Sequence, residues 1–350
     1  MNIQNIKRYD QNDMYSLLKN FPQQVEDAVQ IGKKFPVPYK MKEIDSIVVT
    51  GLGGSAIGGD LLRSYLQDEI KIPFIVNRNY LLPAFVNERT LVIVSSYSGN
   101  TEETISAYND ARKKNAKVIC ITSGGKIAKM AKNYGHPQIV IPAGFPPRVA
   151  LGYSFFPLLK VICKMGFVRE KEKEIRETII LLKRKSKLYS DVKKENVPMM
   201  LAKQIYTKCP IIYSATDRFD VVNLRWRGQI AENAKSLAFG NVIPEMNHNE
   251  LVGWKVLRRM MEEDFAVVFL LNSNDHPRVK VRMEITKNIV EQYTQRVIEV
   301  KSEGKSFLAK MFSLIYVGDW MSFYLAILNG IDPTQVRVID YLKNELAKVK

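Results

Sequence analysis

The chain has 350 residues, 46% of them apolar, which is ordinary for a globular protein of two domains. No apolar run approaches the roughly 18 residues of a membrane span, and residues 1–20 lack the apolar core of a signal peptide, so we expect neither feature. The three cysteines are odd in number and far apart, which favours a reduced, cytoplasmic setting over a secreted, disulfide-bonded one.

The net charge of +16 could indicate a nucleic-acid-binding protein. However, many basic residues are interleaved with acidic ones, as in residues 169–184, and no alternation of basic and aromatic residues of the RNA-binding type is present. We therefore expect a solvated basic surface that also attracts small anions, with neither nucleic acid nor a membrane as partner.

The first half of the chain alternates between strand and helix patterns. Residues 1–40 read as amphipathic helix, which Pro36 and Pro38 end. Strands are expected over residues 47–50, 74–76, 91–94, 117–121 and 138–141, and helices over residues 56–67, 102–115, 127–132 and 153–165. Alternation of this kind predicts an α/β fold with a doubly wound parallel sheet.

Two loops in this half are candidates for binding an anion. Gly51-Leu52-Gly53-Gly54-Ser55 and Ser95-Ser96-Tyr97-Ser98-Gly99-Asn100-Thr101 each follow a strand and open a helix, where backbone N–H groups and the helix dipole favour negative charge. The four hydroxyls of the second loop suit a phosphate monoester. The alternative is that Ser98 and Thr101 simply cap the helix.

The first loop does not indicate a nucleotide. It fits the relaxed G-x-G-x-x-A pattern, but the next strand ends in Asn77-Arg78, where a dinucleotide site would have an acidic residue. No G-x-x-x-x-G-K-[ST] motif occurs either. The phosphate is therefore expected to belong to a small substrate.

The same stretch carries a family resemblance. GLGGSAIGGDLL followed by SSYSGNTEETISAY resembles the sugar isomerase (SIS) domain, a phosphosugar-binding α/β module. The hydroxyl-rich loop before a helix is the most specific mark of that module.

The second half repeats the alternation more loosely. Strands are expected over residues 210–214, 265–271 and 297–300, and helices over residues 221–239, 279–293 and 306–328. The loop Asn272-Ser273-Asn274-Asp275 stands where the hydroxyl loop would be but offers one hydroxyl, so one phosphate site per chain is expected. We expect a first SIS-type domain over 1–165, a helical linker over 166–197 and a second SIS-type domain over 198–350.

Single residues also stand out. Arg148 is most simply a surface charge, but it follows a strand on the sheet edge of the phosphate loops. His136 and His276 precede prolines and read as surface turns. His248 lies in the polar segment Glu245–Glu250 and suits proton transfer near neutral pH. It has only oxygen-bearing neighbours and no second His or Cys nearby, which makes a poor zinc site.

Two motifs of the second half resemble a narrower family. Residues 225–235 (RWRGQIAENAK) and 244–250 (PEMNHNE) closely resemble the dual-specificity phosphoglucose/phosphomannose isomerases, proteins of two SIS modules. The likeness covers nearly the whole chain, including the segment from Asp332 to Lys343. One departure is Gln335, where family members often have proline.

The resemblance implies a role for each matching residue. It implies that Glu232 is the base, that Arg148 stabilises the enediolate, and that His248 and Lys343 assist ring opening. The residues that would bind the substrate phosphate are Gly54, Ser55, Ser96, Ser98 and Thr101. The family is homodimeric, and its active-site histidine is expected to come from the partner subunit.

These residue types fit metal-independent isomerisation of glucose 6-phosphate and mannose 6-phosphate to fructose 6-phosphate. One carboxylate can move a proton between C2 and C1 through a cis-enediol, and arginine supplies a fixed charge for the enediolate. No cofactor or metal is required. Two alternatives are a non-catalytic phosphosugar sensor and an aminosugar-phosphate isomerase.

Overall fold

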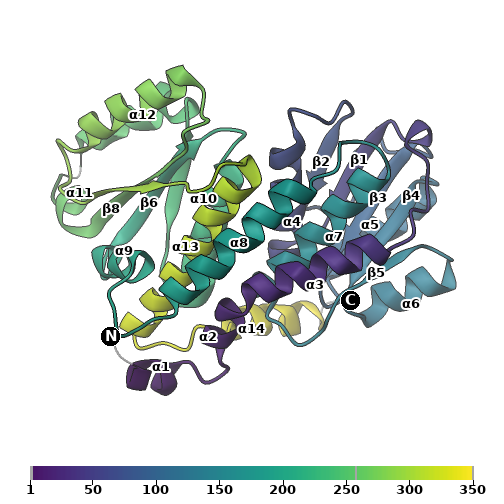
Figure 1. The fold of residues 1–350 in the computed structure, drawn as a ribbon, viewed down its shortest axis with the longest axis horizontal. Helices are drawn as coiled ribbons and strands as arrows, with labels where there is room; N and C mark the ends of the chain where they lie inside the picture. The colour runs from purple at the N-terminus through teal and green to yellow at the C-terminus, as the bar shows by residue number, and fades with distance from the viewer. Residues whose placement is uncertain (1–2, 257, 349–350) are drawn as a thin grey trace. The chain divides into compact units, whose positions relative to one another are not determined.

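The computed structural model describes residues 3–256 and 258–348, which form two compact units (Figure 1). The first unit holds residues 20–181 and 306–309, and the second holds residues 3–19, 182–305 and 310–348. Each unit contains one sheet whose strands all run parallel, with helices between successive strands. The predicted α/β fold with two SIS-like parallel-sheet modules is confirmed.

The sheet of the first unit has the strand order β2-β1-β3-β4-β5. Its strands are β1 Ser46–Thr50, β2 Phe74–Asn77, β3 Thr90–Ser95, β4 Lys117–Thr122 and β5 Gln138–Val140. Its helices are α3 Phe21–Lys34, α4 Gly53–Leu66, α5 Glu102–Lys113, α6 Gly125–Asn133 and α7 Leu151–Lys164, with short turns η1 Met41–Glu43 and η2 Pro147–Val149.

Helices cover both faces of this sheet because its strands are apolar on both sides. Val92 and Val94 of β3 pack with Tyr108 of α5 and Ile127 of α6 in one buried cluster. On the other face α4 approaches the sheet so closely that a Cβ on Gly59 would lie 2.8 Å from Val49 Cγ1. Helix α7 packs on both α3 and α4. This is the doubly wound arrangement that the alternating pattern predicts.

The sheet of the second unit has the order β7-β6-β8-β9, which repeats the order β2-β1-β3-β4 of the first. Its strands are β6 Cys209–Ala215, β7 Phe239–Ile243, β8 Phe265–Leu271 and β9 Val297–Lys301. Its helices are α1 Ile3–Tyr9, α2 Met14–Lys19, α9 Val197–Ile205, α10 Asp220–Ala234, α11 Arg258–Asp264, α12 Pro277–Val290 and α14 Arg337–Leu346. The turns η3 Glu245–His248 and η4 Glu250–Lys255 follow β7.

The helix expected over residues 221–239 is shorter than predicted. Helix α10 ends at Ala234 because Lys235 adopts the left-handed conformation, with φ of +53°. The chain then forms β7, which pairs in parallel with β6 at the edge of the sheet. The fourth strand of this sheet is therefore one that the sequence pattern did not reveal.

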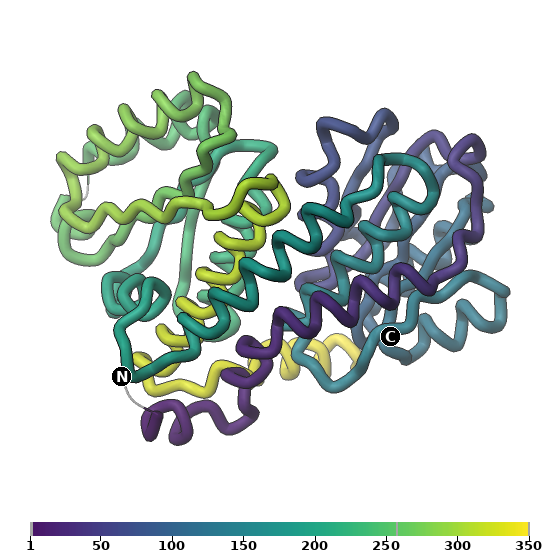
Figure 2. The backbone as a smooth tube through the Cα atoms, viewed as in Figure 1, coloured from purple at the N-terminus to yellow at the C-terminus, as the bar shows by residue number. Residues whose placement is uncertain are grey.

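The two units divide within helix α8. The boundary after Leu181 lies inside helix α8, Glu172–Tyr189, within the segment expected to be a linker. Helices α1 and α2 belong to the second unit, although the sequence groups them with the first. The Tyr316 hydroxyl, for example, donates a 2.8 Å hydrogen bond to the Leu18 carbonyl oxygen. Figure 2 traces the backbone from the N-terminus to the C-terminus.

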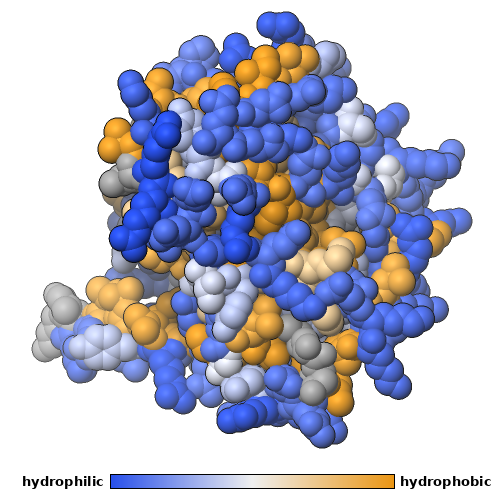
Figure 3. All heavy atoms as spheres, turned by 90° about the vertical axis from the view of Figure 1, so that its left-hand side faces the viewer, coloured by the Kyte–Doolittle hydropathy of each residue, from blue (hydrophilic) through white to orange (hydrophobic). Residues whose placement is uncertain are grey.

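Helix α13, Phe307–Leu328, is the one helix of the described ranges that is long and apolar enough to cross a membrane. Its most apolar window is 94% buried inside the protein, which identifies it as a core helix. The face drawn in Figure 3 is mainly hydrophilic, with hydrophobic side chains between the polar ones.

Candidate active site

The two predicted phosphate loops are hydrogen-bonded to each other at the carboxyl ends of β1 and β3, which are neighbouring strands. The Ser95 hydroxyl donates to the Ser55 carbonyl oxygen over 2.9 Å, and the Ser55 hydroxyl accepts from the Tyr97 N–H over 3.0 Å. A Cβ on Gly51 would lie 2.6 Å from the Ser95 carbonyl oxygen, so the contact requires glycine. The expectation that both loops share one edge of the sheet is confirmed.

Two of the candidate hydroxyls meet at the start of α5. Ser96 Oγ lies 3.0 Å from Thr101 Oγ1, and Ser98 Oγ accepts a 3.2 Å hydrogen bond from the Asn100 N–H. Thr101 is the N-cap residue of α5, but its side chain makes no capping hydrogen bond. Simple capping therefore does not account for these hydroxyls. Together with the N–H groups of the first helical turn they can donate to an anion.

Arg148 lies in η2, directly beside the first loop. A Cβ on Gly54 would lie 2.7 Å from the Pro147 carbonyl oxygen and 3.1 Å from the Arg148 nitrogen. The Arg148 side chain is buried, with 4% of the residue exposed, so it is not the plain surface charge that an isolated arginine usually is. A guanidinium keeps its charge when buried, so this edge of the sheet holds a fixed positive group.

Tyr97 is a functional candidate that the sequence reasoning missed. Its hydroxyl donates to the Pro142 carbonyl oxygen over 2.9 Å and accepts from the Phe145 N–H over 2.8 Å. Burial raises the pKa of the Tyr97 hydroxyl, so the group stays protonated and able to donate. The sequence feature that could have identified Tyr97 is its position among the hydroxyl residues of the second loop.

Glu232 lies in the last turn of α10, in the second unit, and is half-buried. Helix α10 bonds to α13 through side chains spaced four residues apart. Arg225 donates to both carboxylate oxygens of Asp319, at 3.1 and 2.8 Å. Gln229 donates to the same carboxylate at 2.9 Å, and Asn233 donates to the Ser322 hydroxyl at 2.9 Å. This polar ladder fixes the rotation of α10 about its axis and hence the side on which Glu232 lies.

Lys235 joins the end of α10 to the segment that precedes α14. Its ammonium donates to the carbonyl oxygens of Glu232 at 2.7 Å, Asp332 at 2.9 Å and Pro333 at 3.3 Å. A cation at a helix C-terminus is also favoured by the helix dipole. The Lys235 side chain therefore binds two of the segments that carry the family likeness, the end of α10 and the residues before α14.

Arg227, on the same helix, has a buried Nε with no hydrogen-bond partner within the described residues, and burial lowers the pKa of its guanidinium. The pattern of the helix gave no reason to single it out.

His248 is the exposed end of the turn η3. Its neighbours are fixed: Glu250 accepts from the Tyr213 hydroxyl and, over 2.8 Å, from the Asn241 amide, and Asn247 donates to the Thr286 hydroxyl over 2.8 Å. The imidazole is thus presented from an ordered segment, which suits a group that must meet a ligand.

The other two histidines have local roles. His136 Nδ1 lies 2.5 Å from the Tyr108 hydroxyl, and burial lowers the pKa of this half-buried imidazole. It is therefore more than the surface turn residue expected for it. His276 caps α12 by accepting from the Arg278 N–H over 3.2 Å.

Lys343 lies on α14, a helix with no buried side chain in its described length. Lys343 is exposed, and none of the described contacts joins it to another candidate residue. Within residues 3–256 and 258–348, no three His, Cys, Asp or Glu side chains cluster so as to hold a metal ion.

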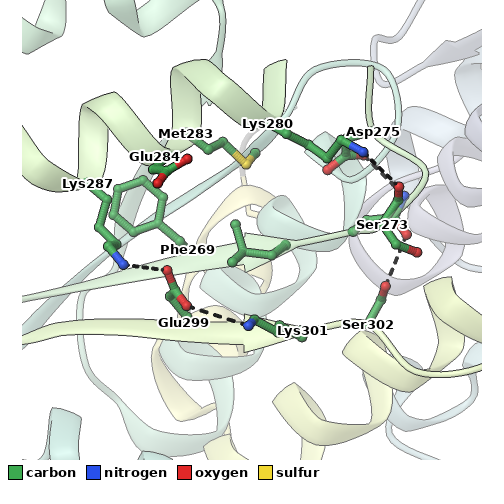
Figure 4. A pocket seen from close by; sticks show the side chains of 12 residues that line it. Phe269, Ser273, Asp275, Lys280, Met283, Glu284, Lys287, Glu299, Lys301 and Ser302 are labelled. Carbon is green, nitrogen blue, oxygen red and sulfur yellow. Dashed lines mark hydrogen bonds and ion pairs between the residues drawn. The ribbon is translucent and has the colours of Figure 1, made fainter. Parts of the chain in front are cut away.

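A cavity of about 420 Å³ lies in the second unit, but it contains none of the predicted site residues. It lies at the carboxyl ends of β8 and β9, where α12 crosses them (Figure 4). Its loop, Asn272–Asp275, corresponds in topology to the hydroxyl loop after β3. The Ser273 hydroxyl accepts a 2.7 Å hydrogen bond from Lys310, and Lys287 pairs with Glu299 at 2.7 Å. The Ser273 hydroxyl and the Lys287 ammonium thus both have polar partners within the protein.

Family models match both units. Residues 40–139 match the SIS domain, and residues 194–346 match the bacterial phospho-glucose isomerase C-terminal SIS domain. The chain is 48% identical to the bifunctional phosphoglucose/phosphomannose isomerase of Caldicellulosiruptor bescii over 96% of this chain and all of that protein. It is 36% identical to the protein of the same name from Aquifex aeolicus, over 96% and 99% of the two chains.

Solved structures agree on the fold. The crystal structure of tagatose-6-phosphate ketose/aldose isomerase from Escherichia coli aligns with a TM-score of 0.68 over 91% of this chain and 93% of that one. The identity is 14%, so this likeness speaks for the fold alone.

Proposed function

This chain belongs to the family of bifunctional phosphoglucose/phosphomannose isomerases, and from that premise we propose that it interconverts glucose 6-phosphate and mannose 6-phosphate with fructose 6-phosphate. The observation that carries the proposal is the 48% identity over the full length of a relative of that name. The reaction is an aldose–ketose isomerisation by proton transfer, with no cofactor and no metal.

The substrate phosphate binds to the two loops of the first unit. Gly54, Ser55, Ser96, Ser98 and Thr101 supply backbone N–H groups and hydroxyls at the starts of α4 and α5. Three phosphate oxygens need many donors, and helix N-termini add the favourable dipole. The hydrogen bonds that hold the two loops together support a common anion site.

Glu232 removes the proton from C2 and returns it to C1, passing through a cis-enediol. The enediolate that forms carries negative charge, and the fixed guanidinium of Arg148 stabilises it. The polar ladder between α10 and α13 supports this role for Glu232, because a general base must be held within hydrogen-bond reach of the proton it moves.

Ring opening precedes isomerisation and needs a proton donor and a proton acceptor. His248 and Lys343 serve this step, and the functional form is a homodimer in which the histidine at each active site is His248 of the partner subunit. The exposure of His248 on an ordered turn supports a role outside its own unit. The enzyme works in the cytoplasm, on small sugar phosphates, without nucleic acid or a membrane as partner.

A coupled assay for fructose 6-phosphate formation, with EDTA present, tests this proposal. Glucose 6-phosphate and mannose 6-phosphate are offered separately to the wild-type protein, to Glu232→Gln and to the control Glu291→Gln, which changes an exposed glutamate at the end of α12. We expect wild type and control to turn over both sugars, and Glu232→Gln to lose about 10²-fold or more in kcat.

Turnover of glucose 6-phosphate alone would keep the isomerase and remove its dual specificity. Absence of turnover in the wild type, with fructose 6-phosphate still bound, would contradict the enzyme and leave a phosphosugar sensor.

A further inference from the structure

The backbone that follows Arg148 is held by one side chain of a helix distant in the sequence. The Gln24 amide, on α3, donates from Nε2 to the Val149 carbonyl oxygen over 2.9 Å. Its Oε1 accepts from the Gly152 N–H over 2.8 Å. One planar amide therefore bridges Val149, at the end of η2, and Gly152, in the first turn of α7. It spans the point where the turn that carries Arg148 continues into the helix.

The contact is built for this side chain. Gln24 is 4% exposed, so the amide is withdrawn from water and each of its hydrogen bonds matters. A Cβ on Gly152 would lie 2.7 Å from Gln24 Oε1, so the missing side chain of Gly152 is what lets the amide approach. The bridge needs one donor and one acceptor at fixed spacing, which methionine and an ionised glutamate do not provide.

The same loop is also held by the phosphate loops. Gly54 lies against Pro147 and Arg148, and the Tyr97 hydroxyl binds Phe145 and Pro142. The segment 142–152 is thus fixed at three places: by each phosphate loop and by Gln24. Arg148 lies at the middle of the three.

We propose that Gln24 is a positioning residue of the isomerase, which holds Arg148 in register with the bound phosphate. The proposal rests on the role given above to Arg148. Stabilisation of a developing enediolate depends on donors that are already in place, and a displacement of about 1 Å can cost about 10²-fold in rate. Gln24 acts through Arg148 rather than on the substrate itself.

Gln24→Met and Gln24→Glu test the proposal, with Gln23→Met as matched control. Gln23 is the neighbouring residue of the same helix, and its amide binds the exposed Asp27 carboxylate at the surface. We expect both Gln24 variants to lose about 10- to 100-fold in kcat, with KM for fructose 6-phosphate within about threefold of wild type. Gln23→Met keeps both constants. A rise in KM with unchanged kcat would overturn the proposal, because the loss would then lie in ground-state binding.

A double-mutant cycle separates positioning from a general loss of structure. In an Arg148→Ala background, Gln24→Met has no arginine left to misplace, so we expect it to change kcat by less than about threefold. A full 10- to 100-fold further loss in that background would contradict the proposal. An Arg148→Ala variant with wild-type kcat would instead remove the premise that Arg148 is catalytic.

Hydrogen exchange gives a readout that does not depend on activity. In Gln24→Met we expect the amides of residues 149–152 to exchange about tenfold faster or more, while those of α5 keep their wild-type rates. Unchanged exchange at residues 149–152 would show that Gln24 does not hold the loop. If residues 149–152 exchange faster in Gln24→Met but the wild-type protein has no isomerase activity, the proposed function is contradicted. The finding that Gln24 holds the loop would still stand.

Discussion

At the scale of single residues, the phosphate-binding role proposed for the hydroxyls of Ser96 and Thr101 can be measured. Their oxygens are hydrogen-bonded to each other over 3.0 Å, and the Thr101 side chain makes no capping hydrogen bond to α5. A hydrogen bond to a charged group contributes roughly 1.5–3 kcal/mol, which corresponds to about a 10- to 150-fold change in affinity. Thr101→Val is therefore expected to raise KM for each sugar phosphate by about that factor, with kcat nearly unchanged.

Two variants control that measurement in steady-state kinetics. Thr101→Ser keeps the hydroxyl and should keep KM within about threefold of wild type. Ser106→Ala removes a half-buried hydroxyl farther along α5 and should change neither constant. A loss of kcat at constant KM in Thr101→Val would place Thr101 in the chemical step instead of in phosphate binding.

At the scale of elements, the polar ladder between α10 and α13 is the feature that stability measurements can reach. Arg225 and Asp319 are almost fully buried, at 3% and 4% side-chain exposure. Removing one partner of a buried ion pair leaves an uncompensated charge, which costs about 3–5 kcal/mol. We expect Asp319→Ala to lower the free energy of unfolding by that amount in urea denaturation.

The double variant Arg225→Met/Asp319→Leu removes both charges and should regain most of that loss, because apolar side chains of similar size can replace a buried pair. Arg259→Met, which breaks an exposed i,i+4 pair with Glu263, should cost less than about 1 kcal/mol. If Asp319→Ala cost no more than this surface control, the ladder would not be what fixes α10.

Elements also show how far sequence reasoning reaches. The strands β1, β3, β4 and β8 and both phosphate loops follow from β-branched runs bounded by glycine and hydroxyl residues. Strand β7 was missed because Lys235 ends α10 with a left-handed conformation that is uncommon for a non-glycine residue and leaves no mark in the pattern. Phe239–Ile243 is also half-exposed at a sheet edge and lacks the continuous apolar run of a central strand.

At the scale of the whole molecule, the sequence pattern could not predict which distant segments contact each other. The N-terminal helices join the second unit through bonds such as that from Tyr316 to Leu18, and Gln24 meets a carbonyl 125 residues away. Periodicity shows that a face is buried, but not which distant segment covers it. The phosphate loops came from the strand–loop–helix pattern and the catalytic roles from motif likeness, whereas the Gln24 and Tyr97 contacts needed coordinates.

The C-terminal helix α14 carries the last expectation. Val338, Tyr341 and Leu342 are 82%, 66% and 57% exposed, although they share an apolar side of the helix. Contiguous apolar surface of this kind marks an interaction site, and the homodimer of the proposed function supplies a second copy to cover it. We expect Val338→Glu/Leu342→Glu to shift the protein from dimer to monomer in sedimentation velocity. Lys348→Glu, at the end of the same segment, makes a matched change of charge and should leave the dimer intact.

If each active site uses His248 of the partner subunit, the monomer should lose isomerase activity and keep the fold of each unit. A dimer that persists in the double variant would place the interface elsewhere, and a monomeric variant with full activity would show that His248 acts within its own chain.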